Sequence, residues 1–265
     1  MEKIDLLIID PQNDFCDPKG SLFVNGANED MLRVSNMINR ISSKLNDIHV
    51  TVDTHHLIDI AHPIYWKDST GKHPDPFTII NKDEVENSKW ITTQPSLYRR
   101  SLEYVRQLSK NNRYPLCIWP PHCLIGSWGH NIYPCIFESL IKWENEFAMI
   151  DYVTKGSNLY TEHYSAVVAD VPDPDDPSTQ INIKLIETLQ KADMIVICGE
   201  AGSHCLANTV RDIVTAFDDD SYIKKLILLT DGTSPVTGFE KLQEDFINEM
   251  TAKGMQLSTT EKFLK

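Results

Sequence analysis

Short apolar runs alternate along the chain with amphipathic segments of helical spacing, and this alternation restricts the fold more than any other feature. Strands are predicted near residues 4 to 10, 48 to 53, 115 to 118, 148 to 154, 193 to 199 and 224 to 230. Helices are predicted near residues 29 to 45, 96 to 111, 180 to 191, 203 to 217 and 237 to 252. Joined by right-handed crossovers, these elements predict an α/β fold: a doubly wound, mostly parallel, six-stranded sheet with helices on both faces.

Composition excludes several classes of protein. The 265 residues, 41% hydrophobic and 24% charged, suffice for one globular domain, and we expect residues 1–265 to form it. A net charge of -13 argues against nucleic acid and anionic membranes as partners, because phosphate contacts need clustered Lys and Arg. No apolar run approaches the roughly 20 residues that span a bilayer. Without a signal peptide at its start, and with six cysteines at unpaired spacings, the chain is expected to be cytoplasmic with reduced thiols.

A candidate nucleophile follows the apolar run at 194–198. The segment 199–205, of sequence GEAGSHC, leads from this predicted strand into a predicted helix, which places Cys205 in the first helical turn with Ser203 as the expected N-cap. Free amides and the helix dipole lower the pKa of a thiol there, and the same amides can receive an oxyanion. A buried structural cysteine is the alternative reading.

Two charged residues at other strand ends could assist this thiol. Asp10 ends the apolar run 4–9, and the carboxyl ends of parallel strands meet at one edge of a sheet, so Asp10 and Cys205 can be neighbours. Lys155 ends the run 148–154 and could hold Cys205 as a thiolate. The alternatives are a turn-capping aspartate and a solvated surface lysine.

A metal site is predicted at a further strand end. Asp53 and His55 share one face of a strand by its two-residue period, and a carboxylate with an imidazole suits a divalent metal. Prolines before His122 restrict its direction and make it the third candidate ligand. His62 is a further candidate ligand. Polar groups at the rim of a pocket are the alternative for all these histidines.

Taken together and in this chain order, the motifs resemble one known family. They are the segment DPQNDF at 10–15, the pair Asp53 and His55, the segment WPPHC at 119–123, the pair Lys155 and Gly156, and the segment GEAGSHC at 199–205. The chain is similar in these motifs to the nicotinamidase/pyrazinamidase branch of the isochorismatase-like cysteine hydrolases.

The resemblance implies a function for each motif. It implies a catalytic triad of Asp10, Lys155 and Cys205. It also implies that Asp53, His55 and His122 hold one divalent metal ion, which is expected to be zinc, with iron and manganese as the alternatives. It also implies a cis peptide bond between Glu200 and Ala201 and an oxyanion hole made by the amides of Ala201 and Cys205. Phe15 and Trp119 match aromatic positions that line the family's substrate pocket.

Departures from the family pattern leave the substrate open. Glu200 stands at a commonly apolar position and could face solvent or contact the substrate. A longer stretch at about 63–113 is an insertion relative to compact family members, with an amphipathic helix in it, and it could form a lid, a subunit contact or an inert excursion.

The expected function is hydrolysis of a small aromatic carboxamide through a thioester on Cys205, and nicotinamide is the expected substrate. The same scaffold could instead hydrolyse another small amide or carbamoyl compound. A catalytically silent binding protein is disfavoured because the chain retains all three triad residues, and ether cleavage is disfavoured because members with that activity lack the cysteine. The small-molecule amide is the expected partner, and a homo-oligomer is compatible with the sequence.

Overall fold

The computed structural model describes residues 2–111, 113–217 and 219–265. Met1 and Asn112, which fall within the predicted domain and the predicted insertion, and Asp218 lie outside the described residues. No helix within the described ranges is both long enough and apolar enough to cross a membrane.

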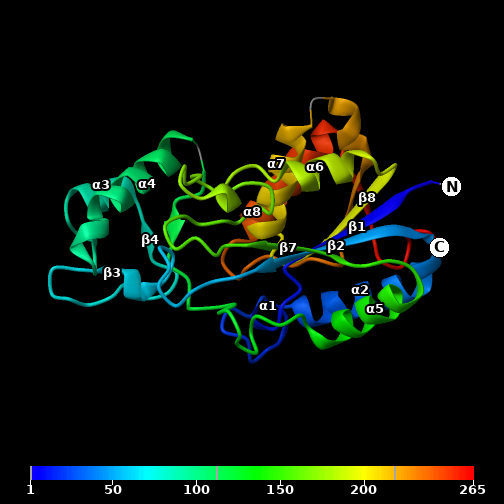
Figure 1. Cartoon of the computed structure of the whole chain (residues 1–265), viewed down its shortest axis with the longest axis horizontal. Coiled ribbons are helices and arrows are strands. Elements are labelled where there is room, and N and C mark those ends of the chain that lie inside the picture. The colour runs from blue at the N-terminus through cyan, green and yellow to red at the C-terminus, as the bar shows by residue number, and fades with distance from the viewer. Residues whose placement is uncertain (1, 112, 218) are drawn as a thin grey trace.

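A six-stranded parallel sheet forms the centre of the molecule (Figure 1). Its strands are β1 (Ile4–Ile9), β2 (Leu45–Asp53), β7 (Asp151–Lys155), β8 (Met194–Gly199), β9 (Leu226–Leu229) and β10 (Gln256–Ser258), in the order β10-β9-β8-β1-β2-β7. Every residue of β1 is buried, because a strand in the middle of a parallel sheet is covered on both faces. The predicted fold class is confirmed.

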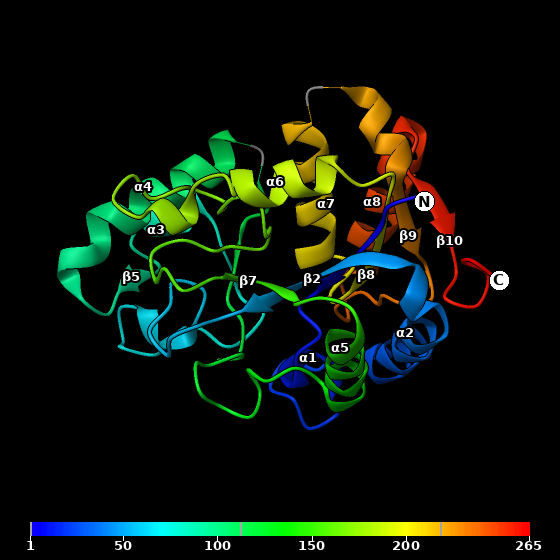
Figure 2. The same cartoon turned by 45° about the vertical axis from the view of Figure 1, so that its right-hand side comes forward.

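Helices cover both faces of this sheet (Figures 1 and 2). α2 (Ala27–Ile41) and α5 (Pro134–Glu146) lie side by side on one face, and the short α1 (Asn13–Cys16) precedes them. The other face carries α6 (Ile183–Gln190), α7 (Cys205–Ala216) and α8 (Glu240–Lys253). The sequence prediction lacked α5, although Pro134 at its first position and the buried Ile136, Leu140 and Trp143 are typical helix signals.

One predicted strand lies outside the main sheet. β6 (Leu116–Cys117) pairs antiparallel with β4 (Ile79–Ile80), so the strand predicted at 115–118 exists but has a different partner. The sixth strand of the main sheet is β10, a three-residue edge strand whose Leu257 is 48% exposed. An edge strand this short and polar has no apolar run to mark it.

The described residues between 63 and 113 form a group of elements beyond the carboxyl ends of the strands (Figure 1). The group contains β3 (Trp66–Lys67), β4, α3 (Lys82–Glu86), β5 (Ile91–Thr92) and α4 (Tyr98–Lys110). Short 3-10 turns lie here and elsewhere: η1 (Ser42–Lys44), η2 (Pro63–Tyr65), η3 (Pro95–Leu97), η4 (Pro177–Thr179) and η5 (Asp220–Lys225). As predicted, α4 is amphipathic and buries Tyr104, Val105 and Leu108.

The strand order brings four strand ends to one place. Starting from β1, the chain first adds β2 and β7 on one side of β1. It then adds β8, β9 and β10 on the other side, so the switch point of the sheet lies between β1 and β8. In the strand register, Ile9 of β1 is paired with Gly199 of β8, and Asp53 of β2 is paired with Lys155 of β7. The residues at and just after these ends therefore share one edge of the sheet.

Candidate active site

Lys155 lies at the centre of a buried group of charged residues. Its Nζ is 2.8 Å from Asp10 Oδ2, 2.9 Å from Asp53 Oδ1 and 3.6 Å from Cys205 Sγ. Cys205 is 8% exposed, and the side chains of Lys155 and both aspartates are at most 4% exposed. The structure thus brings together the three residues of the predicted triad, which lie far apart in the sequence.

Burial sets the protonation of this group. Burial raises the pKa of the Cys205 thiol well above its usual range, and Asp10 and Asp53 add to this, whereas Lys155 opposes it. These effects favour the protonated thiol over the thiolate, and the thiolate held by Lys155 stays a prediction. Burial also raises the pKa of Asp10 despite the opposing Lys155, which makes Asp10 a stronger proton acceptor.

The loop that carries Cys205 differs in one detail from its prediction. His204, not Ser203, is the N-cap of α7, and no side chain caps the helix. Ser203 Oγ instead lies 2.8 Å from His204 Nδ1 and accepts a hydrogen bond from the Val236 amide. Among the described groups, none accepts a hydrogen bond from the amides of Ala201 and Cys205, which leaves both donors free at the cavity. The Glu200–Ala201 peptide bond is cis, as the resemblance implies.

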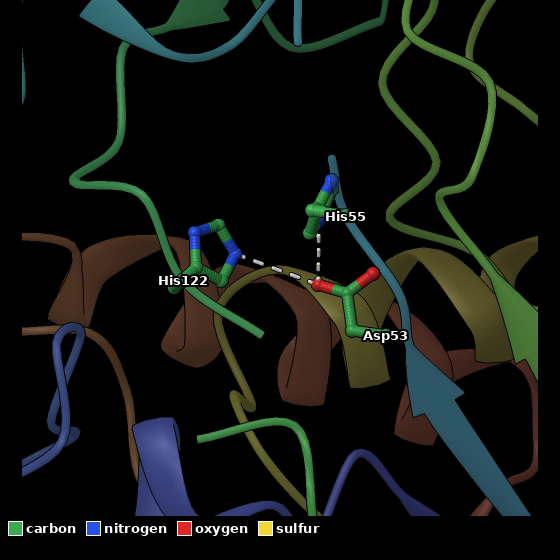
Figure 3. Close-up of side chains that lie close together, drawn as sticks. All are labelled: Asp53, His55 and His122. Atoms are coloured by element: carbon green, nitrogen blue, oxygen red, sulfur yellow. Dashed lines mark hydrogen bonds and ion pairs between the residues drawn. The ribbon is translucent and has the colours of Figure 1, made fainter. Parts of the chain in front are cut away.

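The three predicted metal ligands converge on one point (Figure 3). His55 Nε2 lies 3.0 Å and His122 Nε2 lies 3.5 Å from Asp53 Oδ2, and the three donor atoms are within 4.8 Å of one another. Asp53 ends β2, His55 follows it, and His122 comes from the loop after β6. All three are buried. One carboxylate and two imidazoles in this arrangement fit a divalent transition metal.

Neighbouring acceptors orient both imidazoles toward that point. His55 Nδ1 is 3.0 Å from Asp59 Oδ2, and His122 Nδ1 is 2.9 Å from Pro120 O. An acceptor at Nδ1 holds the proton there and leaves the Nε2 lone pair for a metal. Burial lowers the pKa of His55, but Asp53 and Asp59 outweigh this and raise it well above its usual range. The carboxylates thus favour a positive charge here, which a divalent metal also supplies.

His62 lies beside these three candidate ligands but is not one of the converging donors. Its ring centroid is 5.4 Å from that of His55 and 5.6 Å from that of His122. Burial lowers the pKa of His62 to about 4, so the ring is neutral, and its Nε2 has no hydrogen-bond partner among the described residues. His62 remains a candidate for a further ligand.

A narrow cavity opens onto Cys205. It is lined by Phe15, Leu22, Asp53, Trp119, His122, Glu162, Tyr164, Ala201, His204, Cys205 and Val236. Phe15 and Trp119 are thus among its wall residues, and their contact with a substrate stays a prediction. Glu200 does not line this cavity. Its side chain is fully buried behind the loop, where Oε2 accepts a hydrogen bond from the Ser234 amide at 3.1 Å.

Two residues of the site carried no predicted role. Gln12 holds the backbone of Asp53, because its Nε2 donates to Asp53 O at 2.8 Å and its Oε1 accepts from Asp53 N at 2.7 Å. Glu162 lines the cavity, and its Oε2 lacks a hydrogen-bond partner in the described part of the chain. Burial raises the pKa of Glu162 to about 8, so the acid is mostly neutral at pH 7. Gln12 lies within the DPQNDF motif, whereas Glu162 lies in an irregular loop without a sequence signal.

Comparison with known proteins gives a fold but no close relative. Neither the models of protein families nor the curated proteins include a match to this sequence. Solved structures do match over nearly the whole chain. The yeast nicotinamidase is 21% identical with a TM-score of 0.65, and the alignment covers 96% of this chain and 98% of that one.

Two further solved structures match this chain over nearly its whole length. A nicotinamidase/pyrazinamidase from Acinetobacter baumanii is 19% identical with a TM-score of 0.67, covering 100% of this chain and 99% of that one. A pyrazinamidase from Pyrococcus horikoshii, solved in complex with zinc, is 17% identical with a TM-score of 0.56, covering 97% of this chain and 99% of that one. The protein therefore has the fold that these nicotinamidases and pyrazinamidases share.

Proposed function

We propose that the protein is a metal-containing cysteine amidohydrolase that converts nicotinamide to nicotinate and ammonia. The observation that carries this proposal is the contact of Lys155 with Asp10, Asp53 and Cys205 at one edge of the sheet. A base, a cation and a thiol are the groups that activate a nucleophile for acyl transfer. Two free amides beside the thiol supply an oxyanion site.

Acylation begins with the Cys205 thiol and the amide carbonyl. Asp10 accepts the thiol proton as the sulfur attacks the carbonyl carbon, and the amides of Ala201 and Cys205 donate to the oxyanion of the tetrahedral intermediate. Asp10 then returns the proton to the leaving nitrogen. The C–N bond breaks, ammonia leaves, and the acyl group remains on Cys205 as a thioester.

Deacylation reuses the same groups. Asp10 accepts a proton from water, whose oxygen attacks the thioester, and the proton then passes to the departing Cys205 sulfur. Burial lowers the pKa of Lys155, but Asp10 and Asp53 outweigh this and raise it well above its usual range. Lys155 therefore stays charged and stabilises both the carboxylate of Asp10 and the transient thiolate.

Asp53, His55 and His122 would hold the metal ion of the proposed enzyme. A bound divalent ion supplies Lewis acidity and a fixed point for orienting the substrate. Zinc suits one carboxylate and two imidazoles, and iron and manganese suit the same donors. The P. horikoshii structure in complex with zinc supports zinc as the first metal to test.

A flat heteroaromatic amide suits the walls of the cavity. Phe15 lines it together with Trp119, Tyr164 and His204. The rings of the last three contact one another edge to face or tilted. The free volume is only about 20 Å³, close to the space one water molecule needs. Side chains must therefore move to admit a pyridine ring. The ring centroid of Phe77, which is 49% exposed, lies 5.8 Å from that of Trp119, so the 63–113 segment contacts one wall of the cavity.

Another small amide or carbamoyl compound is the second candidate substrate. The specific observation in its favour is Glu162, a polar side chain in the cavity wall whose Oε2 has no partner among the residues described. A substrate with an additional polar group could bind this oxygen.

A panel of amides tests the proposal. The purified protein with its native metal is incubated separately with nicotinamide, pyrazinamide and a small carbamoyl compound, and ammonia release is measured. Nicotinamide is expected to give the highest kcat/KM. Preference for the carbamoyl compound would select the second candidate, and no release from any compound, with the metal bound and Cys205 unmodified, would favour a silent binding protein.

Gly156 offers a test of the metal site. Its φ is +84°, and a Cβ there would lie 2.7 Å from Asp53 Oδ1 and 3.2 Å from His55 Cε1. In Gly156→Ala, the displaced ligands are expected to lower the affinity for zinc about 10–100-fold, as changes to groups that orient ligands do. The left-handed backbone adds about 1–2 kcal/mol of destabilisation. Zinc titration and denaturant unfolding measure the two effects.

Gly71→Ala is the matched control for this substitution. Gly71 has a φ of +89°, and a Cβ there would have no described atom within 4 Å. This variant should show the backbone destabilisation alone, with zinc affinity unchanged. Equal zinc affinities of the two variants would contradict the assigned metal site.

A further inference from the structure

Two carboxyl groups meet in the interior behind the loop that carries Cys205. Glu200, which precedes Ala201, is fully buried, and Asp30 of α2 is 3% exposed. Ser234 joins them, because its amide donates to Glu200 Oε2 and its hydroxyl donates to Asp30 Oδ2. Two buried carboxylates held by one residue repel strongly, so one proton between them is favoured.

The hydrogen bonds around the pair show where that proton lies. Asp30 Oδ1 accepts from the Arg33 guanidinium and Oδ2 accepts from Ser234 Oγ, so both oxygens of Asp30 have donors. Glu200 Oε2 accepts from the Ser234 amide, whereas Oε1 has no donor among the described groups. A proton on Oε1 turns this unpaired oxygen into a donor to Asp30. One negative charge then faces the one positive charge of Arg33.

Few other titratable groups surround Glu200. Cys16 of α1 and Cys198 of β8 are buried thiols near it, and burial raises the pKa of each above its usual range, with Glu200 adding to the effect. Both therefore stay neutral. The charges of this region are thus those of Glu200, Asp30 and Arg33, with the exposed Glu29 3.9 Å from Arg33 and with Asp231 near Cys198.

The pair connects directly to the Cys205 loop. Ser234, which donates to Glu200, also accepts a hydrogen bond from the Gly202 amide at 2.9 Å. On either side, the Gly199 amide donates to Gly232 O at 2.8 Å and the Val236 amide donates to Ser203 Oγ at 3.0 Å. The segment 232–236 and the side chain of Glu200 therefore hold the loop through these hydrogen bonds.

We propose that Glu200 is a positioning residue: it shares one proton with Asp30, and this neutral acid and carboxylate pair fixes the Cys205 loop and its oxyanion amides. The catalytic consequence rests on the proposed function. The shared proton is a property of the folded chain and is tested without any substrate.

Unfolding as a function of pH tests the proton. Burial raises the pKa of Glu200 well above its ordinary value of 4.5, so the stability that its proton contributes is complete below that value and is lost as pH rises toward the folded-state pKa. The folded protein then binds one more proton than the unfolded chain. Relative to Glu200→Gln, the unfolding equilibrium constant of the wild type should rise about tenfold per pH unit above pH 5.

Glu29→Gln is the matched control for the unfolding experiment. Glu29 is the neighbour of Asp30 in sequence, lies 3.9 Å from the same Arg33, and has a side chain that is 72% exposed. For Glu29→Gln, the ratio of the unfolding equilibrium constants of wild type and variant should be independent of pH. If this ratio is independent of pH for Glu200→Gln as well, the shared proton is overturned.

Turnover of the preferred amide tests the positioning role. Glutamine keeps both bonds, since its amide oxygen accepts from Ser234 and its NH₂ donates to Asp30, so Glu200→Gln should keep kcat within about threefold of the wild type. Alanine removes both bonds, so Glu200→Ala should lower kcat about tenfold or more through displacement of the loop, with KM little changed. Equal kcat values for the two variants would overturn positioning. If the wild type turns over no amide, the proposed function fails, while the unfolding experiment still decides the shared proton.

Discussion

Replacing Cys205 by alanine is expected to abolish amide hydrolysis while metal content stays unchanged. Sγ is the proposed nucleophile, and loss of a nucleophile in such a unit lowers kcat by about 10⁴-fold or more. None of the three proposed metal ligands is altered, so zinc per protein should equal that of the wild type. Ammonia release and metal analysis of the purified variant measure both.

Cys135→Ser is the control for loss of a thiol. Cys135 is unpaired, partly exposed, and lies on α5, away from the cavity lining. Its substitution should leave turnover within about twofold, because surface substitutions away from special features have small effects. A Cys205→Ala protein that still releases ammonia at the wild-type rate would disprove the covalent mechanism.

Replacing Lys155 by methionine should be strongly destabilising as well as inactivating. The substitution leaves Asp10 and Asp53 in the interior without their shared cation. Removing one partner of a buried ion pair lowers the free energy of unfolding by about 3–5 kcal/mol. Denaturant unfolding measures this loss, and Lys155→Met should also show no measurable turnover.

Two further variants separate this effect from loss of a lysine in general. Lys184 pairs with Asp151 at 3.6 Å, but its side chain is 84% exposed, so Lys184→Met should change the free energy of unfolding by less than about 0.5 kcal/mol. Adding Asp10→Asn to Lys155→Met removes one of the uncompensated charges and should recover part of the lost stability. A Lys155→Met protein as stable as the Lys184→Met protein would contradict the buried charge network.

The central strands could be predicted from the sequence because burial on both faces demands a continuous apolar run. β8 satisfies this demand, β1 does so apart from Asp5, and both lie where they were predicted. β10 could not be predicted, since an edge strand needs no such run. The run at 115–118 shows a second limit: a short apolar segment predicts a strand, but distant residues decide which strand it pairs with, here β4 rather than the main sheet.

The candidate site followed from strand ends wherever the backbone itself aims the side chain. Asp10, Asp53 and Lys155 lie at or just after the ends of neighbouring parallel strands, so the sheet brings them together. Glu200 differs because it lies in a loop, whose conformation turns its side chain away from the cavity and toward Asp30. The same dependence on loop conformation explains why Ser203 does not cap α7 and why Glu162 could not be foreseen.

Partitioning with hydroxylamine tests the thioester on Cys205 most directly. Hydroxylamine competes with water for a thioester, so the wild type acting on its preferred amide should form hydroxamate at the expense of the free acid as hydroxylamine is raised. Cys205→Ala should form neither product. Free acid as the sole product at every hydroxylamine concentration would mean that water attacks the amide directly, and would contradict the account.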